Sequence, residues 1–110
     1  MAVKSARFLK PAEMELNEAA EYYESEKTGL GMQFLACLQS TLAQAIDFPE
    51  GGPLVDYARR RRDVRRYQFE RPFPYDLIGT VMGAELVVLA VAHHKREPRY
   101  WISRVDRLKA

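Results

Sequence analysis

An uninterrupted apolar run at residues 86–92 (LVVLAVA) constrains the fold more than any other feature of the chain. A run of this length, rich in valine and leucine, is typical of a strand that is buried on both faces. The run gives way at once to residues 93–96 (HHKR). The sequence therefore predicts a central strand whose exit places polar side chains at the rim of a rigid sheet, a position where functional residues often lie.

The first half of the chain carries helical patterns. Residues 4–9 fit a short first strand, and Pro11 then suits the first turn of a helix, where a backbone N–H group is not needed. Apolar side chains recur at helical spacing and share one face, namely Ala12, Leu16, Ala19, Ala20 and Tyr23. The intervening glutamates take the other directions and predict an acidic outer surface that faces water, formed by Glu13, Glu15, Glu18, Glu21 and Glu24.

A second helix follows a glycine-containing break at residues 28–31. Its apolar stripe consists of Phe34, Leu38, Leu42, Ala45 and Ile46. The helix is expected to end near Phe48, because Pro49 disfavours helical geometry in the residue before it and two glycines come next. Two helices of similar length joined by a short turn predict an antiparallel helical hairpin.

From Asp63 onward the pattern changes to the two-residue period of strands. A first strand ends at residues 72–74, residues 75–81 form the next, and a turn at residues 82–84 leads into the apolar run. Short connections predict antiparallel neighbours. We therefore expect one α+β domain over residues 1–110, with an N-terminal strand, an antiparallel helical hairpin and three antiparallel strands in two layers.

The charge of the chain is unevenly distributed. Residues 1–50 contain four basic against eight acidic side chains, whereas residues 51–110 contain thirteen against seven. A basic second half predicts an acidic partner, either a nucleic acid or an acidic protein. No apolar stretch approaches the ~20 residues that span a bilayer, and no signal core is present. The single cysteine, Cys37, lies in the helical apolar pattern and has no partner for an internal disulfide, which agrees with a reducing compartment. We therefore expect a cytoplasmic protein that does not associate with a membrane.

Six arginines crowd residues 59–66 (RRRRDVRR). Guanidinium groups bind phosphates and carboxylates with two parallel hydrogen bonds, so the cluster suits an anionic partner. The alternative is a solvated segment whose arginines pair with the helix glutamates. Strand alternation sends Arg65 and Arg66 to opposite faces, so only one of them can join a patch on the outer face of the sheet. The four preceding arginines are expected to act through long-range electrostatic attraction, namely Arg59, Arg60, Arg61 and Arg62.

The histidine pair, His93 and His94, does not predict a metal site. Adjacent strand residues point to opposite faces and cannot both bind one ion, and no further ligand stands at suitable spacing. No glycine-rich phosphate loop or nucleophile motif is present, so no cofactor is expected. Trp101 is interpreted as a core residue, whereas Tyr100 is expected beside Arg96, where an acidic or nucleic-acid ligand could meet both side chains.

Several segments, taken in order, resemble the RelE/ParE superfamily of type II toxin–antitoxin toxins, also called plasmid stabilization system proteins. The likeness extends from about Phe8 to Arg104. It is carried by EAAEYY at residues 18–23, GLGMQFL at 29–35, FPEGGP at 48–53, RRY at 65–67, FPY at 73–75 and LAVAHHKREPRYW at 89–101. The resemblance implies the same order of strands and helices, and a small growth-arresting toxin that a cognate antitoxin neutralises.

The helical hairpin, the FPY segment and the His-x-x-Arg-x-Pro-x-Tyr-Trp ending look more like ParE-type members, which inhibit DNA gyrase and imply no hydrolytic site. Gly79 and Thr80 depart from the usual aromatic and basic residues, so a bulge or bend is expected in that strand. On this reading the protein is not an enzyme. Its target or antitoxin would be bound by Arg59, Arg60, Arg61, Arg62, Arg65, Arg96 and Tyr100.

The resemblance also allows a RelE-like endoribonuclease that cuts messenger RNA on the ribosome. Arg65 or Arg66, Arg96 and Tyr100 would then supply the cations and the proton-transfer group at the scissile phosphate. An arginine run replaces the lysine pair common in such sites, and arginine transfers protons poorly because it stays charged. A third reading is an inactive relative that acts only in autoregulation with its antitoxin.

Overall fold

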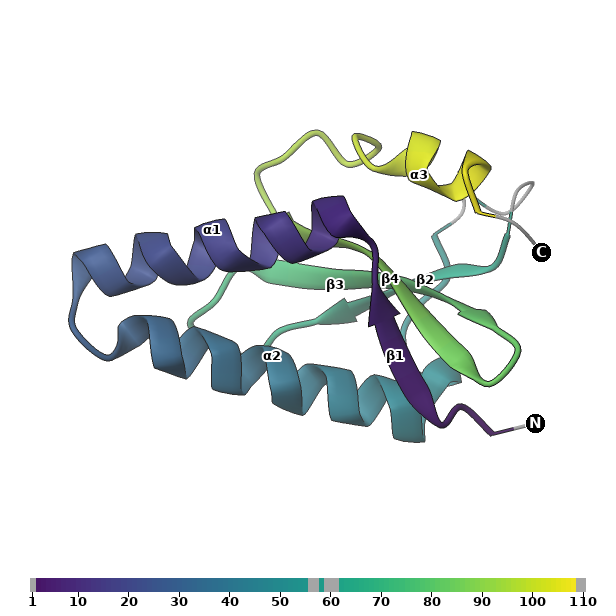
Figure 1. Ribbon diagram of the computed structural model, residues 1–110, viewed down its shortest axis with the longest axis horizontal. Coiled ribbons are helices and arrows are strands. Elements are labelled where there is room, and N and C mark those ends of the chain that lie inside the picture. The colour runs from purple at the N-terminus through teal and green to yellow at the C-terminus, as the bar shows by residue number, and fades with distance from the viewer. Residues whose placement is uncertain (1, 56–57, 59–61, 109–110) are drawn as a thin grey trace.

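A computed structural model describes residues 2–55, 58 and 62–108 of the chain. A four-stranded sheet has the order β1-β4-β3-β2 (Figure 1). Its strands are β1 (Ser5–Phe8), β2 (Val64–Gln68), β3 (Tyr75–Met82) and β4 (Glu85–His93). The helices are α1 (Lys10–Glu26), α2 (Leu30–Asp47), the 3-10 turn η1 (Pro49–Gly51) and the short α3 (Ile102–Asp106). The predicted order is confirmed, and α3 is an element that the sequence analysis did not predict.

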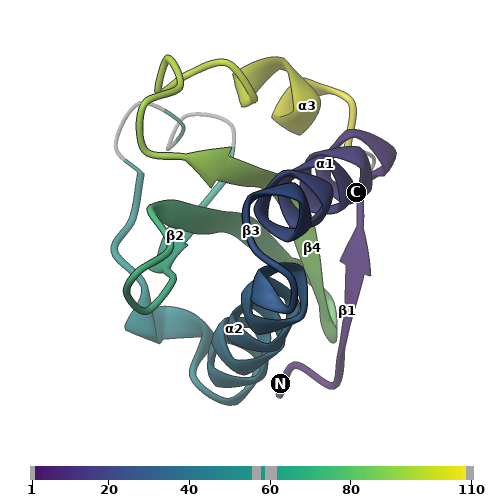
Figure 2. The same cartoon turned by 90° about the vertical axis from the view of Figure 1, so that its left-hand side faces the viewer.

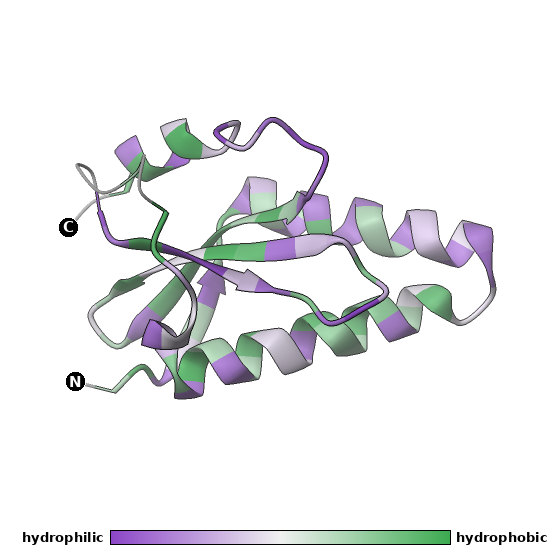
Figure 3. Ribbon diagram, turned by 180° about the vertical axis from the view of Figure 1, so that it is seen from behind, coloured by the Kyte–Doolittle hydropathy of each residue, from purple (hydrophilic) through white to green (hydrophobic). Residues whose placement is uncertain are grey.

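The apolar run forms the inner strand β4, as predicted. It pairs antiparallel with β3 and parallel with β1, and residues 86–91 are all buried. Figure 3 shows hydrophobic colour on the central strands, whereas the connection from β4 to α3 is hydrophilic. Within the described residues, no helix is both long and apolar enough to cross a membrane.

The predicted helical hairpin is confirmed, and Figure 2 shows α1 and α2 side by side in end-on view. Gly29 permits the tight turn because its φ of 91° lies in the left-handed region. The Glu24 carboxylate accepts hydrogen bonds of 3.1 Å from the backbone N–H groups of Gly29 and Gly31. A Cβ atom on Gly31 would lie only 2.7 Å from the Ala20 carbonyl oxygen, so the close approach of the two helices at this point needs a glycine.

Aromatic side chains form the core between the hairpin and the sheet. Phe34 is fully buried at the centre of this group. Its ring centroid lies 5.1–5.5 Å from those of four neighbours, which are Tyr23, Phe69, Phe73 and Tyr75. These separations are typical of edge-to-face and tilted aromatic pairs. The apolar helix faces predicted from the sequence are therefore the faces that pack against the sheet.

A second, smaller core lies on the opposite face of the sheet. It contains Val55, Ala58, Val64, Ile78, Leu89, Ala90, Trp101 and Val105. The predicted two-layer arrangement holds for the hairpin and the sheet, and α3 with residues 53–55 and 58 adds a partial third layer. Trp101 is 1% exposed, which confirms its interpretation as a core residue. This second core fixes the C-terminal segment against the outer face of the sheet.

β4 carries a bulge opposite Gly79 of β3. The pairing of β3 shifts between Ile78, opposite Ala90, and Gly79, opposite Val88, so Leu89 is the extra residue. A Cβ atom on Gly79 would lie 3.1 Å from Leu86 Cδ1 and 3.3 Å from the Val87 carbonyl oxygen. The pairing is therefore irregular at Gly79, as expected, but the bulge lies in β4 and not in the strand that contains Gly79.

One of the glutamates assigned to the solvent-facing surface of the first helix does not face solvent. The Glu15 side chain is 16% exposed and forms an ion pair with Arg104. It lies at the border of the apolar face of α1, on the side where α3 covers the helix. The prediction that all five glutamates face water is therefore wrong for Glu15.

Candidate functional site

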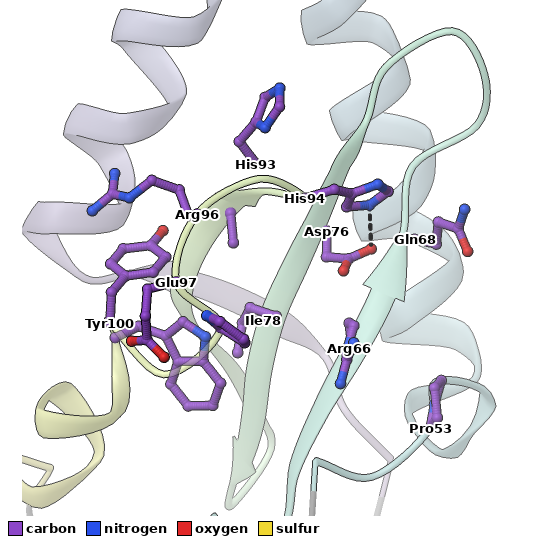
Figure 4. A pocket seen from close by; sticks show the side chains of 13 residues that line it. Pro53, Arg66, Gln68, Asp76, Ile78, His93, His94, Arg96, Glu97 and Tyr100 are labelled. Carbon is purple, nitrogen blue, oxygen red and sulfur yellow. Dashed lines mark hydrogen bonds and ion pairs between the residues drawn. The ribbon is translucent and has the colours of Figure 1, made fainter.

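The outer face of the sheet contains a pocket of about 430 Å³ beside the C-terminal segment (Figure 4). Its floor is apolar and includes Ile78, Ala92 and Trp101. Polar side chains from β2, β3 and the 93–100 segment surround this floor, among them Arg66, Gln68, Asp76, His94, Arg96 and Tyr100. A small apolar surface ringed by a few polar groups is typical of binding sites.

The two strand arginines diverge, as alternation requires. The Arg65 guanidinium lies on the helix side and donates hydrogen bonds to the carbonyl oxygens of Gly52 at 2.7 Å and Glu50 at 3.3 Å. Arg66 is exposed and lines the pocket on the outer face. The structure thus brings Arg66, and not Arg65, to the pocket that Arg96 and Tyr100 share.

The rest of the arginine run is only partly described. Arg59, Arg60 and Arg61 lie outside the described residues. Arg62 is half-buried and lines a separate pocket of about 660 Å³ together with Arg65 and Tyr67. Arg62 and Arg65 therefore belong to a different surface from Arg96 and Tyr100, and the described members of the predicted binding set divide between two faces.

Arg96 and Tyr100 form a stacked pair, as expected. The Arg96 guanidinium carbon lies 3.8 Å from the centroid of the Tyr100 ring, which is the geometry of a cation–π contact. The Tyr100 hydroxyl is buried, and no described group hydrogen-bonds to it with good geometry. Burial, together with the nearby Glu15 carboxylate, raises the pKa of Tyr100 well above its ordinary value. The site therefore presents the cation of Arg96 and hides the hydroxyl of Tyr100.

The two histidines have different environments. His94 Nε2 lies 3.1 Å from Asp76 Oδ1, across the β3–β4 pair. His93 points away from this pair (Figure 4), and its Nδ1 accepts a hydrogen bond from the Lys95 N–H group. Burial lowers the pKa of His93. In the part of the chain that the structure describes, no group of three or more potential metal ligands is present.

Sequence reasoning missed three polar residues near the site: Glu15, Asp76 and Arg104. Asp76 and Arg104 are far along the chain from their partners, His94 and Glu15, so no local sequence pattern indicates these contacts. Glu15 carried a weak signal, because it lies at the edge of the apolar face of its helix rather than opposite to it. All three are placed by tertiary packing.

Gly52 places β2 and therefore Arg66. A Cβ atom on Gly52 would lie 2.5 Å from the Arg66 carbonyl oxygen, although its φ of −89° is accessible to any residue. We expect Gly52→Ala to lower the free energy of unfolding by about 2 kcal/mol, as overpacking does. Gly51→Ala is the matched control, because its Cβ would meet only Phe48 Cβ, at 3.6 Å. Urea denaturation of both variants measures the difference, and equal stability would contradict the predicted clash.

Comparison with known proteins agrees with this fold. The family model of the ParE toxin of type II toxin–antitoxin systems, parDE, matches residues 6–98. This span includes Arg66 and Arg96, whereas Tyr100 and Arg104 lie beyond it. No curated protein matches the chain.

A solved structure described as the chromosomal ParDE TA system from P. aeruginosa is similar to the chain. The TM-score is 0.65 at 14% sequence identity, and the match covers 83% of this chain and 95% of that chain. At this identity the likeness concerns the fold. The family match, which spans most of the sequence, goes further: the chain belongs to the ParE toxin family of type II toxin–antitoxin systems.

Proposed function

We propose that this ParE-type toxin arrests growth by inhibiting DNA gyrase, and that the Arg96–Tyr100 surface takes part in binding that target. As a toxin of a toxin–antitoxin pair, the protein has a cognate antitoxin as partner. Gyrase acts on the bacterial chromosome, so the proposal places the active toxin in the cytoplasm. On this proposal the toxin acts by binding and carries out no bond cleavage.

The buried hydroxyl of Tyr100 is the observation that carries this proposal. A tyrosine that transfers a proton must reach the substrate, and its pKa must be close enough to the working pH for exchange. The Tyr100 hydroxyl is inaccessible, and its pKa is raised rather than lowered. Tyr100 is therefore better suited to support Arg96 than to act on RNA.

The placement of the cations favours the same conclusion. Cleavage of RNA needs cations that converge on one scissile phosphate. Figure 4 shows Arg66 and Arg96 at opposite ends of the pocket, and Arg96 stacks on Tyr100 instead of pointing toward Arg66. Arginine and tyrosine held in this way are typical of residues that dominate the energy of protein–protein interfaces.

One feature supports the second candidate function, a ribosome-dependent endoribonuclease. The Asp76 carboxylate lies within hydrogen-bond distance of His94, and both side chains line the pocket beside Arg66. An imidazole oriented by a carboxylate is a common general acid or base, and it would take over the role that Tyr100 is unable to fill. His94 is therefore the residue that distinguishes the two functions.

The two functions predict opposite results in one experiment. The toxin and its Arg96→Ala and His94→Ala variants are induced in bacteria, and plasmid supercoiling and messenger RNA ends are followed. We expect disturbed supercoiling with intact transcripts, an effect that His94→Ala retains. For purified toxin, Arg96→Ala should raise the concentration that halves gyrase supercoiling by about tenfold, equivalent to ~1.4 kcal/mol.

Lys95→Ala is the control, because Lys95 is an adjacent cation that is absent from the pocket lining. It should inhibit gyrase as the unchanged toxin does. Codon-phased transcript cuts that disappear in His94→Ala, with normal supercoiling, would refute gyrase inhibition and establish the nuclease.

A further inference from the structure

The central strand loses its parallel neighbour near the candidate site. β1 ends at Phe8, which pairs with Val88, whereas β4 continues to His93. Beyond this point the backbone groups of β4 need other hydrogen-bonding partners, because unpaired polar groups are costly in a buried strand. Two side chains supply partners for two of these groups. Arg104 Nη1 donates to the Leu89 carbonyl oxygen at 2.8 Å, and the Val91 N–H group donates to Glu15 Oε1 at 3.1 Å.

These two side chains also bind each other. Arg104 Nη2 lies 2.9 Å from Glu15 Oε2, and Arg104 Nη1 lies 3.1 Å from Glu15 Oε1. The side chains are only 15% and 16% exposed, so solvent screens the pair weakly. Figures 1 and 2 both show α3 beside α1, with β4 next to them. The Glu15–Arg104 pair therefore joins α1, α3 and the bulged part of β4 at one point.

The same pair contacts the residue on which Arg96 stacks. The Arg104 guanidinium carbon lies 5.2 Å from the Tyr100 ring centroid, and the Arg96 guanidinium carbon lies 3.8 Å from it. The Tyr100 ring thus has an arginine from α3 and an arginine from the 94–100 segment as neighbours. Glu15 and Arg96 also line a common groove of about 260 Å³ between α1 and the end of β4. Arg96 is thus connected to the Glu15–Arg104 pair through the Tyr100 ring.

We propose that Glu15 and Arg104 are positioning residues of the toxin, which hold the Tyr100 ring in place so that Arg96 is presented to the target at a fixed position. The inference rests on the proposed role of Arg96 in target binding. It does not depend on which target is bound. Glu15 lies within the residues that match the family model, whereas Arg104 lies beyond them.

A purely structural role for the pair would give a different outcome in a double-mutant cycle. If Arg104 acts through Arg96, Arg104→Ala should reduce the activity of the unchanged toxin. In a toxin that already carries Arg96→Ala, the same change should reduce activity little further. If Arg104 only stabilises the fold, the two losses should add. The cycle therefore separates positioning from stability.

The test uses the full chain with Arg104→Ala, Arg96→Ala and the double variant. Activity is measured as the inducer concentration that halves growth, with toxin levels checked by immunoblot. We expect each single change to raise this concentration by about tenfold, and the double variant to exceed the stronger single variant by no more than about twofold. Additive losses would overturn the inference. No effect of Arg96→Ala would refute the proposed role of Arg96, and with it the positioning of that residue.

Structural readouts test the pair without reference to any target. Trp101 is the single tryptophan and follows Tyr100 directly, so its fluorescence reports on this segment. In Arg104→Ala, acrylamide should quench Trp101 more strongly, and the Val91 amide should exchange at least about tenfold faster, at temperatures where the helical circular dichroism is unchanged. Glu15→Gln is the milder variant, because it removes the charge and keeps an acceptor for Val91.

A matched control comes from an exposed ion pair on the same sheet. Arg7 Nε lies 3.0 Å from Glu85 Oε1, and these side chains are 48% and 38% exposed. Glu85→Gln should leave Trp101 quenching, Val91 exchange and toxicity unchanged, because exposed pairs contribute little. Unaltered quenching and exchange in both Arg104→Ala and Glu15→Gln would overturn the inference, even if the proposed target proved correct.

Discussion

Replacement of Phe34 by alanine is expected to lower the free energy of unfolding by about 4 kcal/mol. Phe34 is fully buried, and its ring contacts four other aromatic rings between the hairpin and the sheet. The loss combines the transfer free energy of the ring, the cavity left behind and the lost aromatic contacts. Because these neighbours come from α1, from β3 and from the connection between β2 and β3, the cavity weakens the whole helix-side core.

Phe48→Ala is the matched control for this prediction. Phe48 is the same residue type at the end of α2, but it is 73% exposed. Its replacement should change stability by less than about 0.5 kcal/mol. Urea denaturation followed by circular dichroism measures both variants. A similar loss for Phe34→Ala and Phe48→Ala would contradict the assignment of Phe34 to the centre of the core.

The sequence predicts those parts of the fold that depend on local periodicity. The helix stripes that contain Phe34 and Leu38, and the apolar run of β4, are visible because burial on one or two faces imposes a regular spacing. The tight turns are visible because Gly29 and Gly83 stand where the backbone has positive φ. The order of elements follows from these signals, which are read over a few residues at a time.

The parts that the sequence does not predict depend on contacts between distant residues. α3 has five residues, too few to establish an apolar period, and it is held by Trp101 and Val105 in the second, smaller core. The parallel pairing of β1 with β4 joins residues 5–8 to residues 85–88. The position of Glu15 at the edge of the apolar stripe is only a weak local signal, because Arg104, which covers that side of α1, is 89 residues away in the chain.

The candidate site was predicted in the same uneven way. Arg96 and Tyr100 are four residues apart, and their contact follows from the local segment. Local sequence does not show which face of the sheet the C-terminal segment covers, so it does not show that Arg66, rather than Arg65, lies beside Arg96. Asp76 was missed because its pairing with His94 depends on the register between β3 and β4. The residue types at the site were therefore predictable, and their grouping was not.

Trp101→Ala is expected to be the other strongly destabilising change, because it leaves a cavity at the centre of the second, smaller core. The free energy of unfolding should fall by about 4 kcal/mol. Its consequences should differ from those of Phe34→Ala. Trp101 anchors the segment that carries Arg96, Tyr100 and Arg104, whereas the helical hairpin packs on the other face. We therefore expect native-state hydrogen exchange to show local opening of residues 102–108 while α2 still exchanges by global unfolding.

Trp101→Phe provides the graded comparison, because a smaller ring keeps part of the packing and should lose less stability than alanine. Growth arrest should decrease with the fraction of molecules in which the C-terminal segment is packed on the sheet. The decrease should be largest in Trp101→Ala and smaller in Trp101→Phe.

Antitoxin binding tests the face of the sheet that the helical hairpin covers, since an antitoxin contact confined to that face should survive local opening of the C-terminal segment. If α2 and residues 102–108 lose protection together in Trp101→Ala, the two cores unfold as one unit. The C-terminal segment would then have no independent opening through which Arg96 could be displaced.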